Sequence, residues 1–400
     1  MVDPIKNPYS PGAGTPPPFL AGRGELEDAF STLIGRAAIG NSVQPLVLSG
    51  LRGVGKTVLL LRWRSIAQNE GWATAHIEAR PDADLREQLA DAVVDVLRQV
   101  SRRFRNQERV EHLKRVGASF LRATGATVSR GGIAFDVEPE PGVADSGSLE
   151  TDLTELLLEL GAAAREEGTG AVLLIDELQD AGNDALAGIV GACHRVNQES
   201  VPALVVGAGL PTVGRVLSEA KSYAERLFDV RSIGPLPPEA ADLAVSEPAE
   251  RLDVTVALDA LERLRDLAGG YPFFIQTFAK YVWDAAPESP ISGDDVEYAA
   301  PEANEQLGRS FFGPRYDRAT PAERRYMHAM AAVGDGPSSS GDVAETIGRR
   351  PSDVSVQRDG LITKGLVYAP ERGMVSFTVP HMAGFLRSLP AHEYGSPTTG

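Results

Sequence analysis

The sequence predicts an α/β fold, in which a parallel sheet sandwiched by helices is followed by two smaller units. Short apolar runs of strand length alternate with stretches whose apolar residues recur at helical spacing, as a parallel sheet with crossover helices requires. The strand-like runs end before Pro235, and a second mixed pattern begins near residue 312. A chain of 400 residues has room for about two to four domains of ordinary size.

Composition and charge exclude several classes of protein. Hydrophobic residues make up 42% and charged residues 24%, as in globular rather than disordered chains. The sequence has no apolar run of the roughly 18 to 20 residues that a bilayer helix needs, and its start lacks the pattern of a signal peptide. The single cysteine, Cys193, excludes an internal disulfide framework and favours a cytoplasmic location. The net charge of −16 opposes nonspecific binding to nucleic acid, so any such contact must be local.

The elements of the α/β part follow one another in a regular order. Residues 1–18 are rich in proline, which predicts an extended arm, and helical periodicity begins after Phe19. Residues 82–168 are mostly helical in pattern, with a hairpin expected over 127–137. Strands are predicted at 44–49, 72–79, 171–175 and 203–206, and helices at 57–68, 153–165 and 186–196.

Prolines between the predicted elements suggest where the chain divides into domains. After Pro235, helices are predicted at 239–246, 257–268 and 272–286. Pro287, Pro290 and Pro301 then interrupt the pattern. The expected domains are an arm over 1–18, an α/β core over 19–235 with an insertion at about 82–168, a helical unit over 236–311, a third unit over 312–388 and a flexible tail over 389–400.

A glycine-rich segment between the first predicted strand and helix has the phosphate-loop pattern. Lys56 would supply a charge to the β- and γ-phosphates and Thr57 a hydroxyl to Mg²⁺, while the helix start, including Val58, faces the same anion. The alternative is a flexible surface loop. The segment consists of Gly50, Leu51, Arg52, Gly53, Val54, Gly55, Lys56 and Thr57.

Two adjacent carboxylates follow the apolar strand at 171–175. Asp176 and Glu177 therefore lie at the carboxyl edge of a parallel sheet, where ligands bind in such folds. Asp176 is placed to hold Mg²⁺, directly or through water. Glu177 is placed to act as the general base that deprotonates water, which predicts hydrolysis of ATP rather than binding alone. The alternative is a pair of solvated acids at a strand end.

These motifs resemble those of AAA+ ATPases. The resemblance rests on GLRGVGKT, on LLIDE and on FLAGRGELE before the first strand. Within that family the chain looks most like the origin-recognition (initiator-like) and STAND branch, because GGYP over 269–272 is similar to the motif that opens the lid helix there. The resemblance implies a helical lid over 236–311, with Pro272 near the base or sugar of ATP. The alternative for Pro272 is an ordinary helix start after a glycine cap.

The sequence departs from the family pattern at two places. Gly207, Ala208 and Gly209 stand where AAA+ proteins usually carry a polar sensor residue at a strand end, and the lid helix offers Gln276 but no cation. Arg226 is a candidate finger toward a neighbouring subunit, and its alternative is a solvated or internally paired side chain.

The C-terminal unit resembles a winged-helix domain. Helices predicted at 321–333, 340–347 and 352–364 precede a strand pair over 366–368 and 374–378. The corresponding DNA interface would use Arg349, Arg350 and Arg358 on phosphates, and Ser355 and Gln357 on base edges. The alternative is a winged helix used for protein contact or autoinhibition.

Two functions are consistent with this pattern. The first is an ATPase that hydrolyses ATP with Mg²⁺ as a conformational switch controlling the winged helix, whose partner is DNA or a protein. The second is a nucleotide-gated, DNA-binding regulator with little or no turnover, as the missing sensor residue at Gly207 to Gly209 suggests. Oligomerisation is compatible with both. The histidines lack the spacing of a zinc site, so no zinc is expected.

Overall fold

The chain folds into two compact units in the computed structural model, which describes residues 2–12, 14–81, 83–125 and 137–390. The first, here called the α/β unit, comprises residues 23–50 and 56–233. The second, here called the helical unit, comprises residues 1–22, 51–55 and 234–400. The hairpin expected over 127–137 lies almost wholly outside the described residues, as does the expected tail from residue 391 onward.

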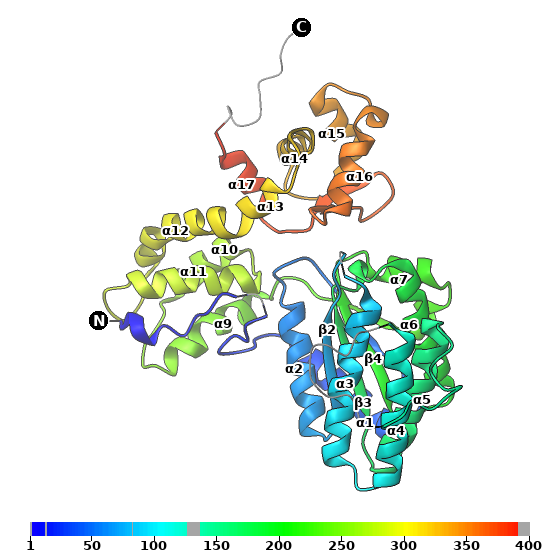
Figure 1. The fold of residues 1–400 in the computed structure, drawn as a ribbon. Coiled ribbons are helices and arrows are strands. Elements are labelled where there is room, and N and C mark those ends of the chain that lie inside the picture. The colour runs from blue at the N-terminus through cyan, green and yellow to red at the C-terminus, as the bar shows by residue number, and fades with distance from the viewer. Residues whose placement is uncertain (1, 13, 82, 126–136, 391–400) are drawn as a thin grey trace. The chain divides into compact units, whose positions relative to one another are not determined.

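The α/β unit is built on a parallel sheet with the strand order β2-β3-β4-β1-β5 (Figure 1). The central strands are buried on both faces, which explains why they are continuous apolar runs rather than alternating ones. This arrangement confirms the predicted fold class. The strands are β1 (Leu46–Ser49), β2 (Ala73–Glu78), β3 (Ala171–Asp176), β4 (Ala203–Gly209) and β5 (Asp229–Ser232).

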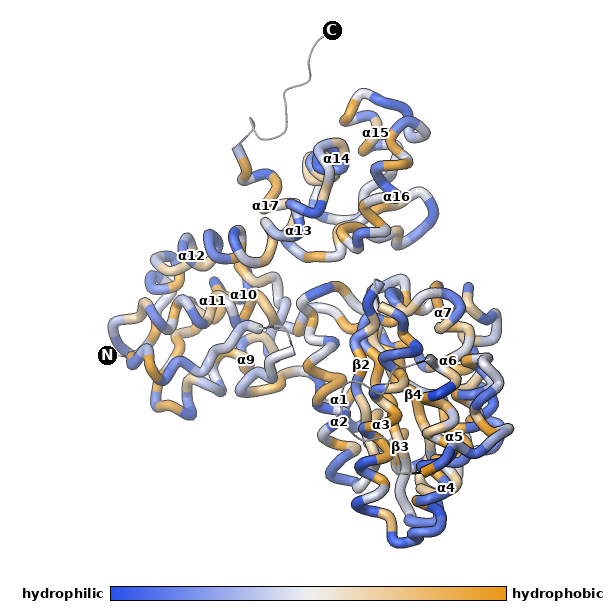
Figure 2. Tube along the Cα trace, viewed as in Figure 1, coloured by the Kyte–Doolittle hydropathy of each residue, from blue (hydrophilic) through white to orange (hydrophobic). Residues whose placement is uncertain are grey.

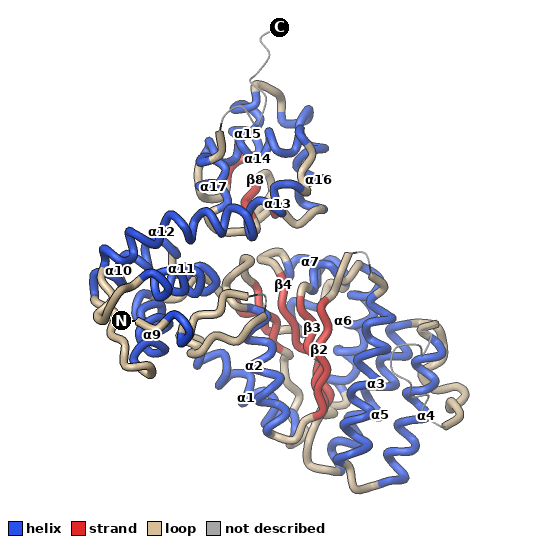
Figure 3. The backbone as a smooth tube through the Cα atoms, turned by 60° about the vertical axis from the view of Figure 1, so that its left-hand side comes forward, coloured by secondary structure: helices blue, strands red, loops and turns tan. Residues whose placement is uncertain are grey.

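Helices cover both faces of this sheet (Figure 3). Helices α1 and α2 pack together on one face, while α3, α5 and α6 lie on the other and α4 packs against α3 and α5. Side chains of Asp84, Asn106 and Ser148 cap the starts of α3, α4 and α5. The helices are α1 (Gly24–Ala38), α2 (Lys56–Asn69), α3 (Leu85–Arg103), α4 (Gln107–Ala123), α5 (Leu149–Glu166), α6 (Asn183–Gln198), α7 (Val213–Ala220) and α8 (Ala224–Leu227).

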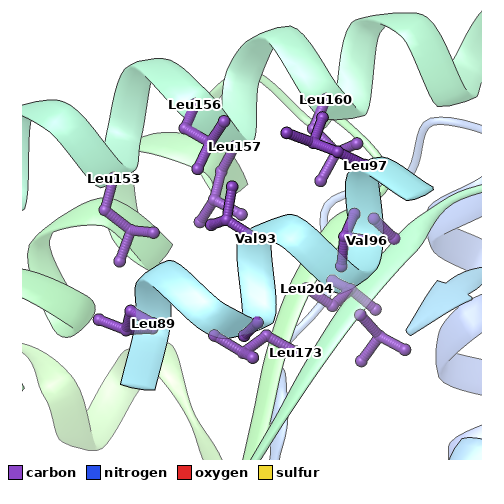
Figure 4. A pocket seen from close by; sticks show the side chains of 13 residues that line it. Leu89, Val93, Val96, Leu97, Leu153, Leu156, Leu157, Leu160, Leu173 and Leu204 are labelled. Atoms are coloured by element: carbon purple, nitrogen blue, oxygen red, sulfur yellow. The ribbon is translucent and has the colours of Figure 1, made fainter. Parts of the chain in front are cut away.

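Apolar residues concentrate on the strands and on the inward faces of these helices (Figure 2). An apolar cavity of about 40 Å³ remains between α3, α5 and the sheet, lined by residues such as Leu89, Leu156 and Leu173 (Figure 4). Cavities that bind small molecules are several times larger, at about 300 to 1,000 Å³, and carry polar groups that orient the ligand. We therefore interpret this cavity as a packing defect.

The helical unit begins with four helices after Pro235. They are α9 (Pro238–Glu250), α10 (Leu258–Ala268), α11 (Pro272–Ala285) and α12 (Gly293–Leu307). Helix α12 was not predicted, and Pro301, expected to interrupt the chain, lies inside it. A Ser292–Asp295 capping box starts this helix and Val296, Ala299 and Ala303 bury its inner face, which together offset the hydrogen bond that Pro301 cannot donate.

The N-terminal arm packs onto these helices instead of extending without contacts. Pro4–Lys6 forms a 3-10 helix, and the side chains of Val2 and Tyr9 are buried. The Tyr9 hydroxyl donates to the carbonyl oxygen of Val245 at 2.6 Å, and the indole N–H of Trp283 donates to that of Asp3 at 2.9 Å. The prolines remove backbone donors, but these side chains supply the apolar surface that anchors the arm.

The C-terminal part of the helical unit contains helices and a small antiparallel sheet with the order β6-β8-β7. A π-helix (Gly308–Phe312) leads from α12 into α13, and a 3-10 helix (Pro351–Val354) precedes α16. The elements are α13 (Gly313–Asp317), α14 (Pro321–Val333), β6 (Ser338–Ser339), α15 (Ser340–Ile347), α16 (Ser355–Thr363), β7 (Val367–Tyr368), β8 (Met374–Phe377) and α17 (Met382–Ser388).

Candidate nucleotide site

The glycine-rich segment connects the buried strand β1 to the start of α2. Gly53 and Gly55 adopt φ values of +85° and +92°, which L side chains rarely tolerate, so glycine is required at both turns. The Gly50 N–H donates to the Gly209 carbonyl oxygen at 3.1 Å and ties the start of the loop to the end of β4. Helix α2 then begins at Lys56, and the N–H groups of a helix's first turn point outward toward an anion.

Lys56 is buried, with only 6% of its surface exposed. Its ammonium group donates to the carbonyl oxygen of Gly50 at 2.9 Å, so the side chain folds back along the loop that precedes it. A triphosphate bound at the loop would place its negative charge beside this ammonium group. Val58 follows in the same helical turn and is half-buried.

Thr57 and Asp176 meet although 119 positions separate them in the chain. The Thr57 hydroxyl donates to Asp176 Oδ2 at 2.5 Å, and the Glu177 N–H donates to Asp176 Oδ1 at 2.9 Å. Burial of Asp176, which is 2% exposed, raises the pKa of its carboxyl, and the hydrogen bond from Thr57 acts in the opposite direction.

This donor set fits Mg²⁺. A hydroxyl and a carboxylate are hard oxygen ligands, and Mg²⁺ typically takes one or two carboxylates while phosphates and waters complete its shell. Within the described residues, no group of three or more His, Cys, Asp and Glu side chains could hold a metal ion by itself. Thr57 and Asp176 would hold the ion beside the loop, where Mg²⁺ neutralises charge on the phosphate oxygens of ATP.

Glu177 directly follows β3 and has an unusual backbone conformation. Its φ of 50° and ψ of 44° lie in the left-handed region, which costs a non-glycine residue roughly 1 to 2 kcal/mol. Its carboxylate accepts a hydrogen bond from Gln179 Nε2 at 2.7 Å. Strained backbone of this kind is common at functional sites, where the surrounding contacts hold it in place.

The end of β4 carries no polar side chain among Gly207, Ala208 and Gly209, as the sequence indicated. Gln179 instead reaches this strand end from the turn after Glu177, because its Oε1 accepts the Leu210 N–H at 2.9 Å. Gln179 was not among the predicted site residues. Its position two residues after Glu177 was the only available signal, since its contact with Leu210 depends on the fold.

Pro272 and the expected DNA-contact residues belong to the helical unit. Pro272 is the first residue of α11, and Gly269 ends α10 with a φ of 58°. Both are therefore ordinary cap positions. Loop residues 51–55 group with this unit, and the Phe273 N–H donates to the Gly53 carbonyl oxygen at 3.2 Å. Pro272 thus lies next in the chain to a residue that contacts the glycine-rich loop.

The arginines around α16 are mostly engaged with neighbouring acids. Arg350 pairs with Asp353 at 3.2 Å, and Arg358 pairs with Asp359 at 3.2 Å with only 23% of its side chain exposed. Of the other predicted DNA-contact residues, Arg349 is exposed and Gln357 is half-buried, while the Ser355 hydroxyl donates to the Ser352 carbonyl oxygen. Arg226, the candidate finger, is exposed on α8 of the α/β unit.

Comparisons with protein families match two parts of the chain. Residues 20–206 match the AAA ATPase domain family, and residues 309–386 match a family described as a domain of unknown function (DUF8462). No curated protein matches the sequence. Among the described residues, no helix is both long and apolar enough to span a bilayer.

Solved structures resemble the chain at low sequence identity. A Walker-type ATPase of Pyrococcus abyssi has a TM-score of 0.60 at 16% identity, over 92% of this chain and 96% of that one. Two further structures are less similar, each with a TM-score of 0.46. The ORC1 protein of Aeropyrum pernix in complex with DNA is 18% identical, over 94% of this chain and 95% of that one. The RuvB Holliday junction branch migration motor of Thermotoga maritima is 15% identical, over 92% of this chain and 96% of that one. The family match supports an AAA+ P-loop ATPase domain over residues 20–206, and the Pyrococcus structure supports its fold.

Proposed function

We propose that this protein hydrolyses ATP with Mg²⁺. The observation that carries the proposal is the meeting of Thr57 and Asp176 at 2.5 Å beside the buried ammonium of Lys56, with Glu177 next in the chain. Nucleotide binding alone needs the glycine-rich loop and the metal ligands. The adjacent carboxylate of Glu177 adds a group that can take a proton from water. The match of residues 20–206 to the AAA ATPase domain family supports the same activity.

In this mechanism the loop Gly50–Thr57 holds the β- and γ-phosphates through backbone N–H groups and Lys56. Glu177 accepts a proton from a water molecule, whose oxygen forms a bond to the γ-phosphorus. The bond between the γ-phosphorus and the bridging oxygen breaks with its electron pair passing to ADP, and the products are ADP and inorganic phosphate. Pro272, at the start of α11, contacts the base or sugar in this proposal.

The finer role we propose is that of a conformational switch, in which the bound nucleotide controls a C-terminal winged helix over 312–388. The helices and three-stranded sheet of that segment support this interpretation. Arg350, which precedes the 3-10 helix before α16, pairs with Asp353, and Arg358 on α16 pairs with Asp359. Because Val356 on the same helix is 76% exposed, a protein suits this face better than DNA. The buried Cys193 suits a reducing cytosol.

Two substitutions test the proposed hydrolysis. Glu177→Gln should retain ATP binding but lower kcat by roughly 100-fold to 10,000-fold, because the general base is lost. Lys56→Ala should weaken ATP binding itself, because the charge that contacts the phosphates is removed. Phosphate release and binding of a fluorescent ATP analogue measure the two effects.

Matched controls change exposed residues of the same type. Glu70→Gln, in the turn that follows α2, and Lys6→Ala, in the arm, should behave like the parent protein. A Glu177→Gln variant that hydrolyses ATP as fast as the parent would refute the assigned base. A parent that neither binds nor hydrolyses ATP in the presence of Mg²⁺ would refute the function.

A further inference from the structure

The amide side chain of Gln179 connects the candidate general base to the neighbouring strand of the sheet. Gln179 lies in the 3-10 turn Leu178–Asp180, and its Nε2 donates to Glu177 Oε2 at 2.7 Å and to Asp180 Oδ2 at 3.2 Å. Its Oε1 accepts the Leu210 N–H at 2.9 Å. Both polar atoms of the amide are thus engaged, one with the reacting carboxylate and the other with backbone at the end of β4.

We propose that Gln179 is a positioning residue for ATP hydrolysis, which fixes the carboxylate of Glu177 relative to the end of β4. The inference rests on the function proposed above. An amide can perform this task because it donates and accepts at once, so it joins a carboxylate to a backbone N–H in a defined geometry. Proton transfer from water depends steeply on the position of the base, and this restraint would therefore affect the rate of turnover.

The glycines of β4 make room for this connection. A side chain at Gly207 would overlap Leu178 Cδ1 and come within 2.9 Å of the Ile175 carbonyl oxygen. A Cβ atom at Gly209 would lie 2.8 Å from Gln179 Oε1. Because Gly207 and Gly209 have no side chains, the turn after Glu177 packs directly on the end of β4, and Gln179 brings a polar group to that strand end.

The backbone around Glu177 directs its side chain toward Gln179. Glu177 takes the left-handed conformation, with its N–H bound to Asp176 Oδ1 at 2.9 Å and its carbonyl oxygen bound to the Asp180 N–H at 2.8 Å. These bonds reverse the chain immediately after β3 and place positions 177 and 179 within hydrogen-bonding reach. Asp176, the expected metal ligand, is thus linked to Gln179 through a single residue.

The test removes the amide while preserving the size of the side chain. Gln179→Leu should lower kcat for ATP by about tenfold to 100-fold, because Glu177 is no longer fixed, and should change KM by less than about twofold, since the phosphate loop is untouched. Gln179→Asn is one methylene shorter and cannot span both partners, so kcat should fall in the same direction. Gln198→Leu, the same change on the exposed end of α6, should match the parent.

A double-mutant comparison shows whether Gln179 acts through Glu177. In single-turnover experiments, Gln179→Leu should have no further effect on a Glu177→Gln background, because two residues that act as a unit are not additive. An equal loss on both backgrounds would overturn the inference, as would a loss of ATP binding or of thermal stability that accounts for the lower rate.

The outcomes separate this inference from the function on which it rests. If the parent hydrolyses ATP and Gln179→Leu is equally fast, the positioning role is wrong and the proposed function stands. If the parent binds no ATP and shows no turnover, the proposed function fails and the positioning role fails with it.

Discussion

At the scale of single residues, His328 couples the stability of the helical unit to pH. It lies half-buried on α14 with its Nε2 3.0 Å from the hydroxyl oxygen of Tyr316, and the two rings meet edge to face. Burial lowers the pKa of His328 to about 4 from the usual 6.5, because a charged imidazole is less well solvated there. The ring is therefore neutral in the folded protein at pH values where it is charged in the unfolded chain.

The sign of the effect follows from proton uptake. Between pH 6.5 and about 4 the unfolded chain binds the proton and the folded chain does not, so the free energy of unfolding falls as pH falls through this window and levels off below it. After allowance for solvent screening of this half-exposed group, the loss should be about 1 to 2 kcal/mol. Urea unfolding at pH 7, 5.5 and 4.5 measures it, with His328→Gln as the comparison. Identical pH profiles for parent and variant would contradict the assignment.

The residues of the candidate site differ in how far sequence could predict them. Lys56, Thr57, Asp176 and Glu177 were predictable because each sits within a short contiguous motif whose chemistry follows from residue type and spacing. Gln179 lies equally close in the chain, yet its role arises from a bond to Leu210 on another strand. A contact of that kind depends on strand order, which local patterns do not encode.

At the scale of elements, the N-terminal arm contributes stability to the helical unit. Tyr9 is 3% exposed, packs edge to face on Trp283 and donates to the Val245 carbonyl oxygen. Tyr9→Ala should lower the free energy of unfolding by about 3 to 5 kcal/mol, as for other large buried aromatic residues. Ile5→Ala is the control from the same arm, since Ile5 is 94% exposed and should change stability little. Equal denaturant midpoints for the two variants would show that the arm does not stabilise the unit.

Elements with a strong local signal were predicted, and those defined by long-range pairing were not. Strands β1, β3 and β4 are buried apolar runs, so their sequences alone indicate them. Strand β5 lies at the exposed edge of the sheet and has a mostly polar sequence. It forms a strand because its backbone pairs with β1. Helix α12 was hidden by Pro301, which usually ends a helix.

At the scale of the whole molecule, each unit buries apolar residues of its own. In the α/β unit one cluster extends from Val47 to Phe228, and α1 and α2 bury further side chains such as Phe30 and Trp63. In the helical unit a cluster extends from Val2 in the arm to Leu386 in α17 and includes residues of all the helices from α9 onward. Because stability comes mainly from burial within each core, the two units are expected to unfold as distinct cooperative blocks.

Calorimetry can test this expectation with one large-to-small substitution in each core. Leu113→Ala, on α4, and Met327→Ala, on α14, each remove a side chain that is 0% exposed and should cost about 2 to 5 kcal/mol. Each variant should lower the melting temperature of one transition by several degrees and leave the other in place, whereas Leu258→Ala, at an 84% exposed position, should move neither. A single transition that both core variants shift equally would mean that the units unfold together, because the free energy lost in one core would then be shared by the whole chain.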